Sequence, residues 1–194
     1  PFLLSLLCRS YALLLDELPV PGNILIPMSV DLRGRAGIAR DAVFFNQWSL
    51  QPLLIPRELC VNPEAVFAEL KGQIFENMSE QLPQAFRAAS RLGRIAPFPF
   101  LMSLVNKTKR TGCGTFMYSF LSESSLKSSE FCGHRILNLY HIPSMPPVTG
   151  AGVFMNSFGG ALNVTLSYRE DSLTPNAVRR FISSFVSALP KEAQ

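Results

Sequence analysis

Apolar residues recur every three or four positions in three long stretches of the chain, which is the spacing of one face of an α-helix. The first stretch runs from Phe2 to Leu18, the second follows Asn62, and the third follows Thr174. Asn62 and Thr174 are residue types whose side-chain oxygen caps a helix, and each precedes a proline that suits the first helical turn. Pro83 predicts a kink or break in the second helix, because its ring has no N–H group to donate.

Five other segments carry apolar residues in alternation or in short runs bounded by turn-forming residues, which predicts β-strands. They are Asn23–Asp31, Asp41–Ile55, Thr115–Leu121, Arg135–Ile142 and Ala161–Tyr168. Pro52 predicts that the second strand lies at an edge or stops early, because proline cannot donate to a strand ladder. In the last strand Asn163, Thr165 and Ser167 alternate with apolar residues, so one face is buried and the other is polar.

Helices and strands alternate loosely along the chain, and a further helix is expected within Ala96–Arg110. The chain has 194 residues, the length of one ordinary domain, and no internal repeat or second boundary interrupts it. The pattern therefore predicts an α/β (α+β) mixed-sheet sandwich that spans residues 1–194 as a single domain.

The composition indicates that another lobe or chain covers part of the surface. Hydrophobic residues make up 47% of the chain and charged residues 16%, whereas soluble domains typically carry about 25% charged residues. Because monomers rarely leave large apolar patches uncovered, we expect either a missing lobe or a homodimer.

The net charge of +4 does not indicate nucleic-acid binding, because the basic residues are spread along the chain. One cluster stands out, formed by Lys107, Lys109 and Arg110. It is either a solvated helix end or a contact for a phosphate, such as that of coenzyme A or a phosphopantetheine arm.

The four cysteines stand too far apart for a zinc motif or a disulfide framework. We therefore expect no metal and a reduced, cytoplasmic chain. The apolar start is interrupted by Arg9 and is preceded by neither Met nor a basic region, which argues against a signal peptide or a membrane span. It favours a chain cut from a longer protein.

Catalytic signatures are few. The nucleophile-elbow, phosphate-loop and dinucleotide glycine motifs are absent from the sequence. Neither His134 nor His141 is followed at short range by an acidic residue that would orient it as a base. The segment from Ser157 to Gly160 is either a tight turn or an oxyanion loop, since glycines let backbone N–H groups approach a developing charge.

The run Val30-Asp31-Leu32-Arg33-Gly34-Arg35 is unusual in an apolar neighbourhood. One of its arginines binds a substrate anion or, as we favour, forms a buried pair with Asp31. This run, followed by Val43-Phe44-Phe45-Asn46, resembles the "V-D-x-R-x-R … F-G-N" signature of condensation-type acyltransferases such as the plant BAHD enzymes. Phe45 stands where that signature has glycine.

A second segment resembles the same superfamily. Gly159 to Tyr168 is similar to the "G-x-L-x-V-x-L-S-Y" ending of wax-ester synthase-like and condensation-domain proteins. The resemblance implies a chloramphenicol-acetyltransferase-like lobe, one of two lobes that flank a tunnel. The "H-H-x-x-x-D" motif with the catalytic histidine is absent here, so residues 1–194 would be the C-terminal lobe, separated from its N-terminal partner.

The chemistry that the resemblance implies is acyl transfer. A histidine deprotonates a hydroxyl or amine, which attacks a thioester carried by coenzyme A or a carrier protein. The thioester is a co-substrate, and no tightly bound cofactor is expected. This chain would supply no catalytic residue, and Asp31, Arg33 and Asn46 would be structural motif residues.

One wall of the tunnel would come from this lobe. We expect the substrate-binding residues on it to be Ser157, Asn163, Thr165 and Ser167. Solvent exposure is the equal alternative for the polar face of the last strand. The alternative function is a non-catalytic interaction module of the same fold that self-associates through its apolar face, which would imitate a two-lobed enzyme.

Overall fold

The computed structural model describes residues 1–14, 23–35, 37–40, 47–93, 95–103, 115–121, 130–143 and 149–190. Its helices are α1 (Phe2–Ala12), the short 3-10 helix η1 (Arg57–Val61), α2 (Pro63–Ser79), α3 (Leu82–Leu92) and α5 (Pro175–Ala188), and residues 98–103 are also helical. Its strands are β1 (Asn23–Asp31), β2 (Trp48–Pro56), β3 (Phe116–Leu121), β4 (Glu130–Phe131), β5 (His134–Arg135), β6 (Ala151–Phe158) and β7 (Ala161–Tyr168).

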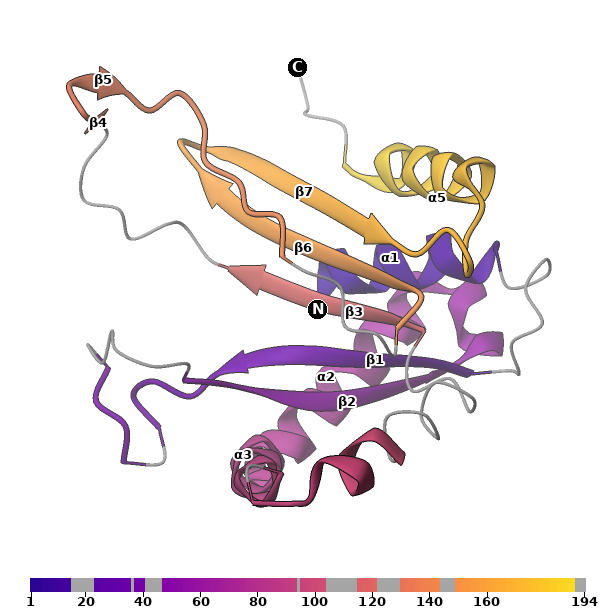
Figure 1. The fold of residues 1–194 in the computed structure, drawn as a ribbon. Coiled ribbons are helices and arrows are strands. Elements are labelled where there is room, and N and C mark those ends of the chain that lie inside the picture. Colours follow the sequence, from indigo (N-terminus) through magenta and orange to yellow (C-terminus); the bar gives the residue numbers. More distant parts are fainter. Residues whose placement is uncertain are drawn as a thin grey trace.

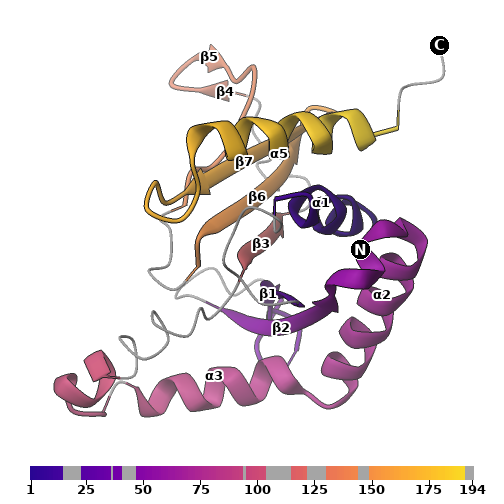
Figure 2. The same cartoon turned by 90° about the vertical axis from the view of Figure 1, so that its right-hand side faces the viewer.

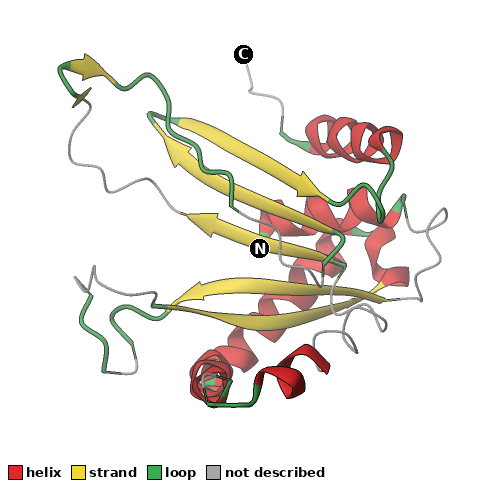
Figure 3. Cartoon of the chain, viewed as in Figure 1, coloured by secondary structure: helices red, strands yellow, loops and turns green. Residues whose placement is uncertain are grey.

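Five strands form one mixed sheet in the order β2-β1-β3-β6-β7 (Figures 1 and 3). The two outer pairs are antiparallel and the two central pairings, β1 with β3 and β3 with β6, are parallel. β4 and β5 form a separate two-stranded hairpin. The predicted mixed-sheet α/β (α+β) sandwich is confirmed.

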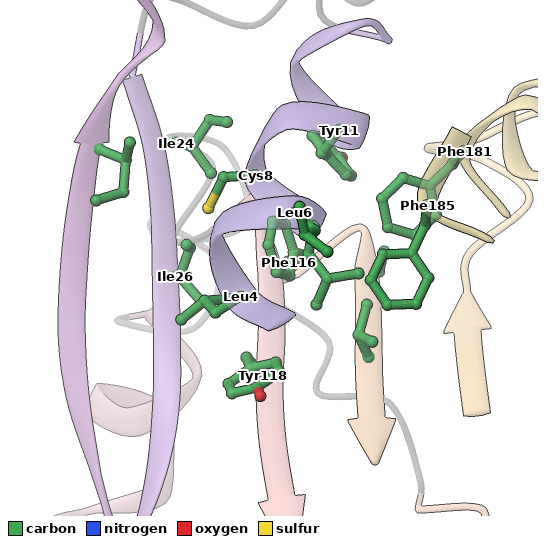
Figure 4. Close-up of a cluster of buried hydrophobic side chains, with 14 of the residues drawn as sticks. Leu4, Leu6, Cys8, Tyr11, Ile24, Ile26, Phe116, Tyr118, Phe181 and Phe185 are labelled. Carbon is green, nitrogen blue, oxygen red and sulfur yellow. The ribbon is translucent and has the colours of Figure 1, made fainter. Parts of the chain in front are cut away.

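Helices cover one face of this sheet, with α1 lying between α2 and α5 (Figure 2). The core lies between α1 and the strands, where Leu4, Ile24, Ile26 and Phe116 are at most 1% exposed (Figure 4). Because successive side chains of a strand point to opposite faces, the alternate residues lie on the other face, which we call the open face.

Three strand predictions hold closely, since β1 and β7 have the predicted limits and β3 begins one residue later than expected. β2 lies at a sheet edge, which is one of the two outcomes that Pro52 predicted. β2 begins only at Trp48, whereas residues 41–46 of the predicted strand lie outside the described residues. The interior strand β6 was not predicted. Its first six residues are all buried, so it shows none of the alternation that marks a half-exposed strand.

The helix predictions hold with shifted ends. Asn62 accepts hydrogen bonds from the N–H groups of Glu64 and Ala65, and the Thr174 hydroxyl accepts one from Ala177 N–H. The break expected at Pro83 falls two residues earlier, at Gln81, which has a φ of 55°. Pro83 occupies the first turn of α3, where a missing N–H leaves no bond unmade. α1 ends at Ala12 rather than Leu18, and residues 15–18 lie outside the described residues.

The prediction of a strand over Arg135–Ile142 was wrong. Only His134 and Arg135 pair with another strand, and residues 136–143, which we call the strap, run extended over β6 and β7 without joining a ladder (Figure 1). Side-chain amides, described below, take the place of a partner strand.

Candidate functional site

The open face of β6 and β7 holds three of the four residues predicted to bind substrate. Asn163, Thr165 and Ser167 stand opposite Asn156, Phe154 and Gly152 in the antiparallel register, and all three are half-buried. Ser157 does not join them. It pairs with Leu162 and points to the helix-covered face of the sheet.

Three asparagine side chains bind the strap to this face. Asn156 is 6% exposed and donates to the Leu139 carbonyl oxygen at 2.7 Å. Asn163 donates to the same oxygen at 3.2 Å and exchanges two hydrogen bonds with the Asn138 amide, at 2.8 and 2.9 Å. The polar groups of these two strands therefore hold the strap in place.

The strap carries one of the two histidines. The His141 ring meets the buried Phe154 ring edge-on, with centroids 6.0 Å apart. His134 is exposed on β5. Within the part of the chain that the structure describes, neither imidazole forms an ion pair, so no acid–base pair is assembled on this face.

Gly159 and Gly160 form the two-residue turn between β6 and β7. Their φ angles are +57° and +81°, values that a hairpin turn with the twist of its strands requires and that glycine adopts without strain. Of the two interpretations of the Ser157–Gly160 segment, the tight turn is the one that the backbone adopts.

The arginine motif follows β1 at the same end of the sheet as the β6–β7 turn, but with β3 lying between β1 and β6. Arg33 and Asp31 form an ion pair at 2.7 Å, and the Arg33 backbone N–H also donates to the Asp31 carboxylate at 2.9 Å. The hydrogen bond from the Arg33 side chain holds the pKa of Asp31 below its ordinary value. The expected pair is present but not buried, since its side chains are 43% and 53% exposed.

Several predicted residues cannot be placed. Asn46 and the candidate phosphate contacts Lys107, Lys109 and Arg110 lie outside the residues that the structure describes. Arg35, the second arginine of the motif, donates to the Met78 sulfur at 3.4 Å and so contacts the end of α2.

A shallow cavity of about 140 Å³ lies elsewhere, beside the loop that joins β7 to α5. Its lining consists of Leu14, Glu170, Asp171, Ser172, Leu173, Thr174 and Ala177. The Asp171 carboxylate is paired with Arg169, which holds its pKa below the ordinary value. None of the predicted site residues lines this cavity.

The described residues show neither a cluster of metal-binding side chains nor a membrane-spanning helix. No group of three or more histidine, cysteine or acidic side chains there is placed to hold a metal ion. Among the same residues, no helix is long and apolar enough to cross a membrane.

Comparisons with known proteins identify the fold. No protein-family model matches the chain, and no curated protein does. A trichothecene 15-O-acetyltransferase from Fusarium sporotrichioides superposes with a TM-score of 0.58 at 18% identity, over 94% of this chain and 40% of that one. The chain has the fold of one chloramphenicol-acetyltransferase-like lobe.

The epimerization domain from the third module of tyrocidine synthetase B has the same fold. It superposes on the lobe with a TM-score of 0.52 at 11% identity, again over 94% of this chain and 40% of that one. The lobe thus spans about 40% of the length of each of these two structures, and the resemblance seen in the sequence motifs is confirmed at the level of the fold.

The sequence did not indicate that the amides of Asn138, Asn156 and Asn163 bind the strap to the sheet. Asn163 was predicted to bind substrate, and its amide donates hydrogen bonds to Asn138 and Leu139 of the strap. Asn156 gave the stronger signal, because an amide in an otherwise apolar run is buried only with hydrogen-bond partners. The identity of that partner depends on where the strap lies.

Proposed function

We propose that this lobe is the C-terminal half of an acyltransferase that moves an acyl group from a thioester of coenzyme A or a carrier protein to a hydroxyl or amine. The observation that carries the proposal is the extent of the structural match. An acetyltransferase of the same fold contains nearly all of this lobe within 40% of its own length. The ordered motifs at Val30–Asn46 and Gly159–Tyr168 support the same assignment.

A partner lobe would contribute the histidine that acts as base. The exposed apolar residues on the hairpin and strap support the need for such a partner. Phe131, Leu137, Tyr140 and Ile142 are between 60% and 85% exposed, and apolar residues gathered in this way typically mark an interaction surface. The strap lies on the open face, so a lobe docked on that face would cover the strap together with the open face.

The open face of β6 and β7 would then form one wall of the substrate tunnel. Thr165 and Ser167 would present hydroxyls to the acyl acceptor or to the donor arm, with Asn163 holding the strap beside them. Ser157 would not take part from its place on the helix-covered face. The thioester would be a co-substrate, and the free buried thiols Cys8 and Cys60 fit a reducing, cytoplasmic setting.

The decisive experiment is to isolate the native protein and measure its intact mass together with its activity. We expect a mass well above the 21.5 kDa of this chain and an upstream segment with H-H-x-x-x-D. Release of free coenzyme A from acyl-coenzyme A with alcohol or amine acceptors, followed by chromatography, should depend on that histidine.

The matched control is the 194-residue chain alone, which should release no coenzyme A above the rate of spontaneous hydrolysis. A native protein of 21.5 kDa, or turnover by this chain unaided, would reject the proposal.

A further inference from the structure

The two edges of the five-stranded sheet are protected very differently. The outer edge of β2 includes Pro52 and Pro56, which have no N–H to offer. Between them, the Gln73 side chain of α2 accepts from Leu54 N–H at 2.8 Å and donates to its carbonyl at 2.7 Å. Asn77 donates to the Pro52 carbonyl at 3.0 Å. These are the means by which proteins prevent a second chain from adding to an edge.

The outer edge of β7 has no such protection in the described residues. Its eight residues, Ala161–Tyr168, include no charged residue and no proline. Arg169 N–H donates to the Gly150 carbonyl at 3.0 Å, which fixes the alternation of the β6–β7 ladder. It follows that the backbone groups of Leu162, Val164, Leu166 and Tyr168 point away from β6.

The same strand is only half covered by helices. Leu166 and Tyr168 pack on the core, whereas Leu162 and Val164, on the same face, are 39% and 41% exposed. Figure 1 shows α5 beside the end of β7 where Tyr168 lies, with the start of the strand extending beyond it. An apolar, uncharged edge of this kind is suited to receive another strand.

We propose that β7 pairs antiparallel with β7 of a second copy of this chain, which joins the two sheets into one of ten strands. A twofold axis at Thr165 places Leu162 opposite Tyr168 and Val164 opposite Leu166 on one face. On the other face Thr165 meets Thr165, and Asn163 meets Ser167. Apolar residues therefore face apolar residues and polar face polar, with no like charges opposed.

The flank of α5 fits this arrangement. Ser184 contacts Ser10 of α1 at 3.2 Å, which marks the side of α5 that faces α1. Ile182 and Val186 lie on the opposite side of the helix by its 3.6-residue period and are 44% and 58% exposed. The twofold axis brings α5 of one copy toward the uncovered Leu162 and Val164 of the other.

The proposal concerns the assembly of this chain and does not depend on acyl transfer. Sedimentation equilibrium of the 194-residue chain should give twice the mass of 21.5 kDa at micromolar concentration. Val164→Pro removes one outward N–H and leaves the β6 ladder intact, so we expect dissociation to a folded monomer. Thr165→Lys should do the same through repulsion across the axis, whereas Ser187→Lys on the exposed face of α5 should not.

Disulfide cross-linking tests the register, in a background with Cys113→Ser and Cys132→Ser that is oxidised with diamide. Thr165→Cys places two thiols on the axis with Cα atoms about 4.5 Å apart, within reach of a disulfide. Ser167→Cys, on the same face, places them roughly 14 Å apart. Cross-linking of the first variant but not the second supports the proposal. A monomer at these concentrations, or a dimer that Val164→Pro and Thr165→Lys leave intact, overturns it.

Discussion

Tyr11 lies where α1, β3 and α5 meet. Its ring centroid is 5.2 Å from that of Phe116 and 5.8 Å from that of Phe181, and the side chain is 4% exposed. The hydroxyl lies 3.4 Å from the Thr115 carbonyl, at the long end of hydrogen bonding. Burial raises the pKa of Tyr11 to about 12, and that of Tyr118 to about 12 as well.

These two tyrosines predict a loss of stability at high pH. Folding raises the pKa because the buried hydroxyl is more stable neutral than ionised. The folded state is therefore fully stable below the ordinary pKa of 10. It loses stability as the pH rises from 10 toward 12, because the unfolded chain ionises first. For Tyr11 alone the loss is about 3 kcal/mol. Thermal unfolding between pH 8 and pH 12 should therefore show a steep alkaline decline in melting temperature.

Replacement of Tyr11 isolates its share of this effect. Tyr11→Phe keeps the ring contacts and should change neutral stability by only about 1 kcal/mol, but it should make the alkaline decline less steep. Tyr140→Phe is the control, because Tyr140 is 60% exposed. Parallel alkaline declines in Tyr11→Phe and the parent chain would contradict the assignment.

The strap shows how an element without a partner strand is held. Its hydrogen bonds to the sheet come from side-chain amides, and Asn163 donates two of them to residues 138 and 139 and accepts a third. Each neutral hydrogen bond contributes about 1 kcal/mol net. The strap is therefore fixed by a few replaceable contacts, unlike the strands beneath it.

Asn163→Ala should release the strap without unfolding the sheet. We expect chymotrypsin to cleave after Tyr140 on the order of 100-fold faster, since local opening becomes less costly by the three hydrogen bonds of Asn163, at about 1 kcal/mol each. Thr165→Ala, on the same face of the same strand, is the matched control and should leave the rate unchanged. Equal cleavage rates in the two variants would show that the amide does not hold the strap.

At the scale of the whole molecule, burial divides the described cysteines into two classes. Cys8 and Cys60 are at most 2% exposed inside the core, and Cys132 is exposed at the tip of the β4–β5 hairpin. Burial raises the pKa of Cys60 to about 11 and raises that of Cys8 further. Since the thiolate is the reactive form, both core thiols are doubly protected.

Alkylation with iodoacetamide at neutral pH, followed by peptide mapping, should modify Cys132 in the native chain. Cys8 and Cys60 should react only after denaturation. Modification of the core thiols at the rate seen for Cys132 would show that the packing of α1 on the sheet opens readily. The same map, made on the native protein, would show whether a partner lobe covers the hairpin.

The sequence by itself determined the local elements, because the signals that specify them act over a few residues. The periods of two and of three to four identified β1, β3, β7 and the helices, and the caps at Asn62 and Thr174 fixed where α2 and α5 begin. The split of β7 into a polar and an apolar face followed in the same way, as did the edge position of β2 from Pro52.

Only the tertiary structure decided which of these elements are neighbours. The order of the strands, the strap that Asn156 and Asn163 bind, and the separation of Ser157 from Thr165 all depend on contacts between residues distant in sequence. Strand β6 was hidden because a strand buried on both faces loses its alternation. The tertiary structure also decided that α2 blocks the β2 edge of the sheet, through Gln73, while the β7 edge stays open.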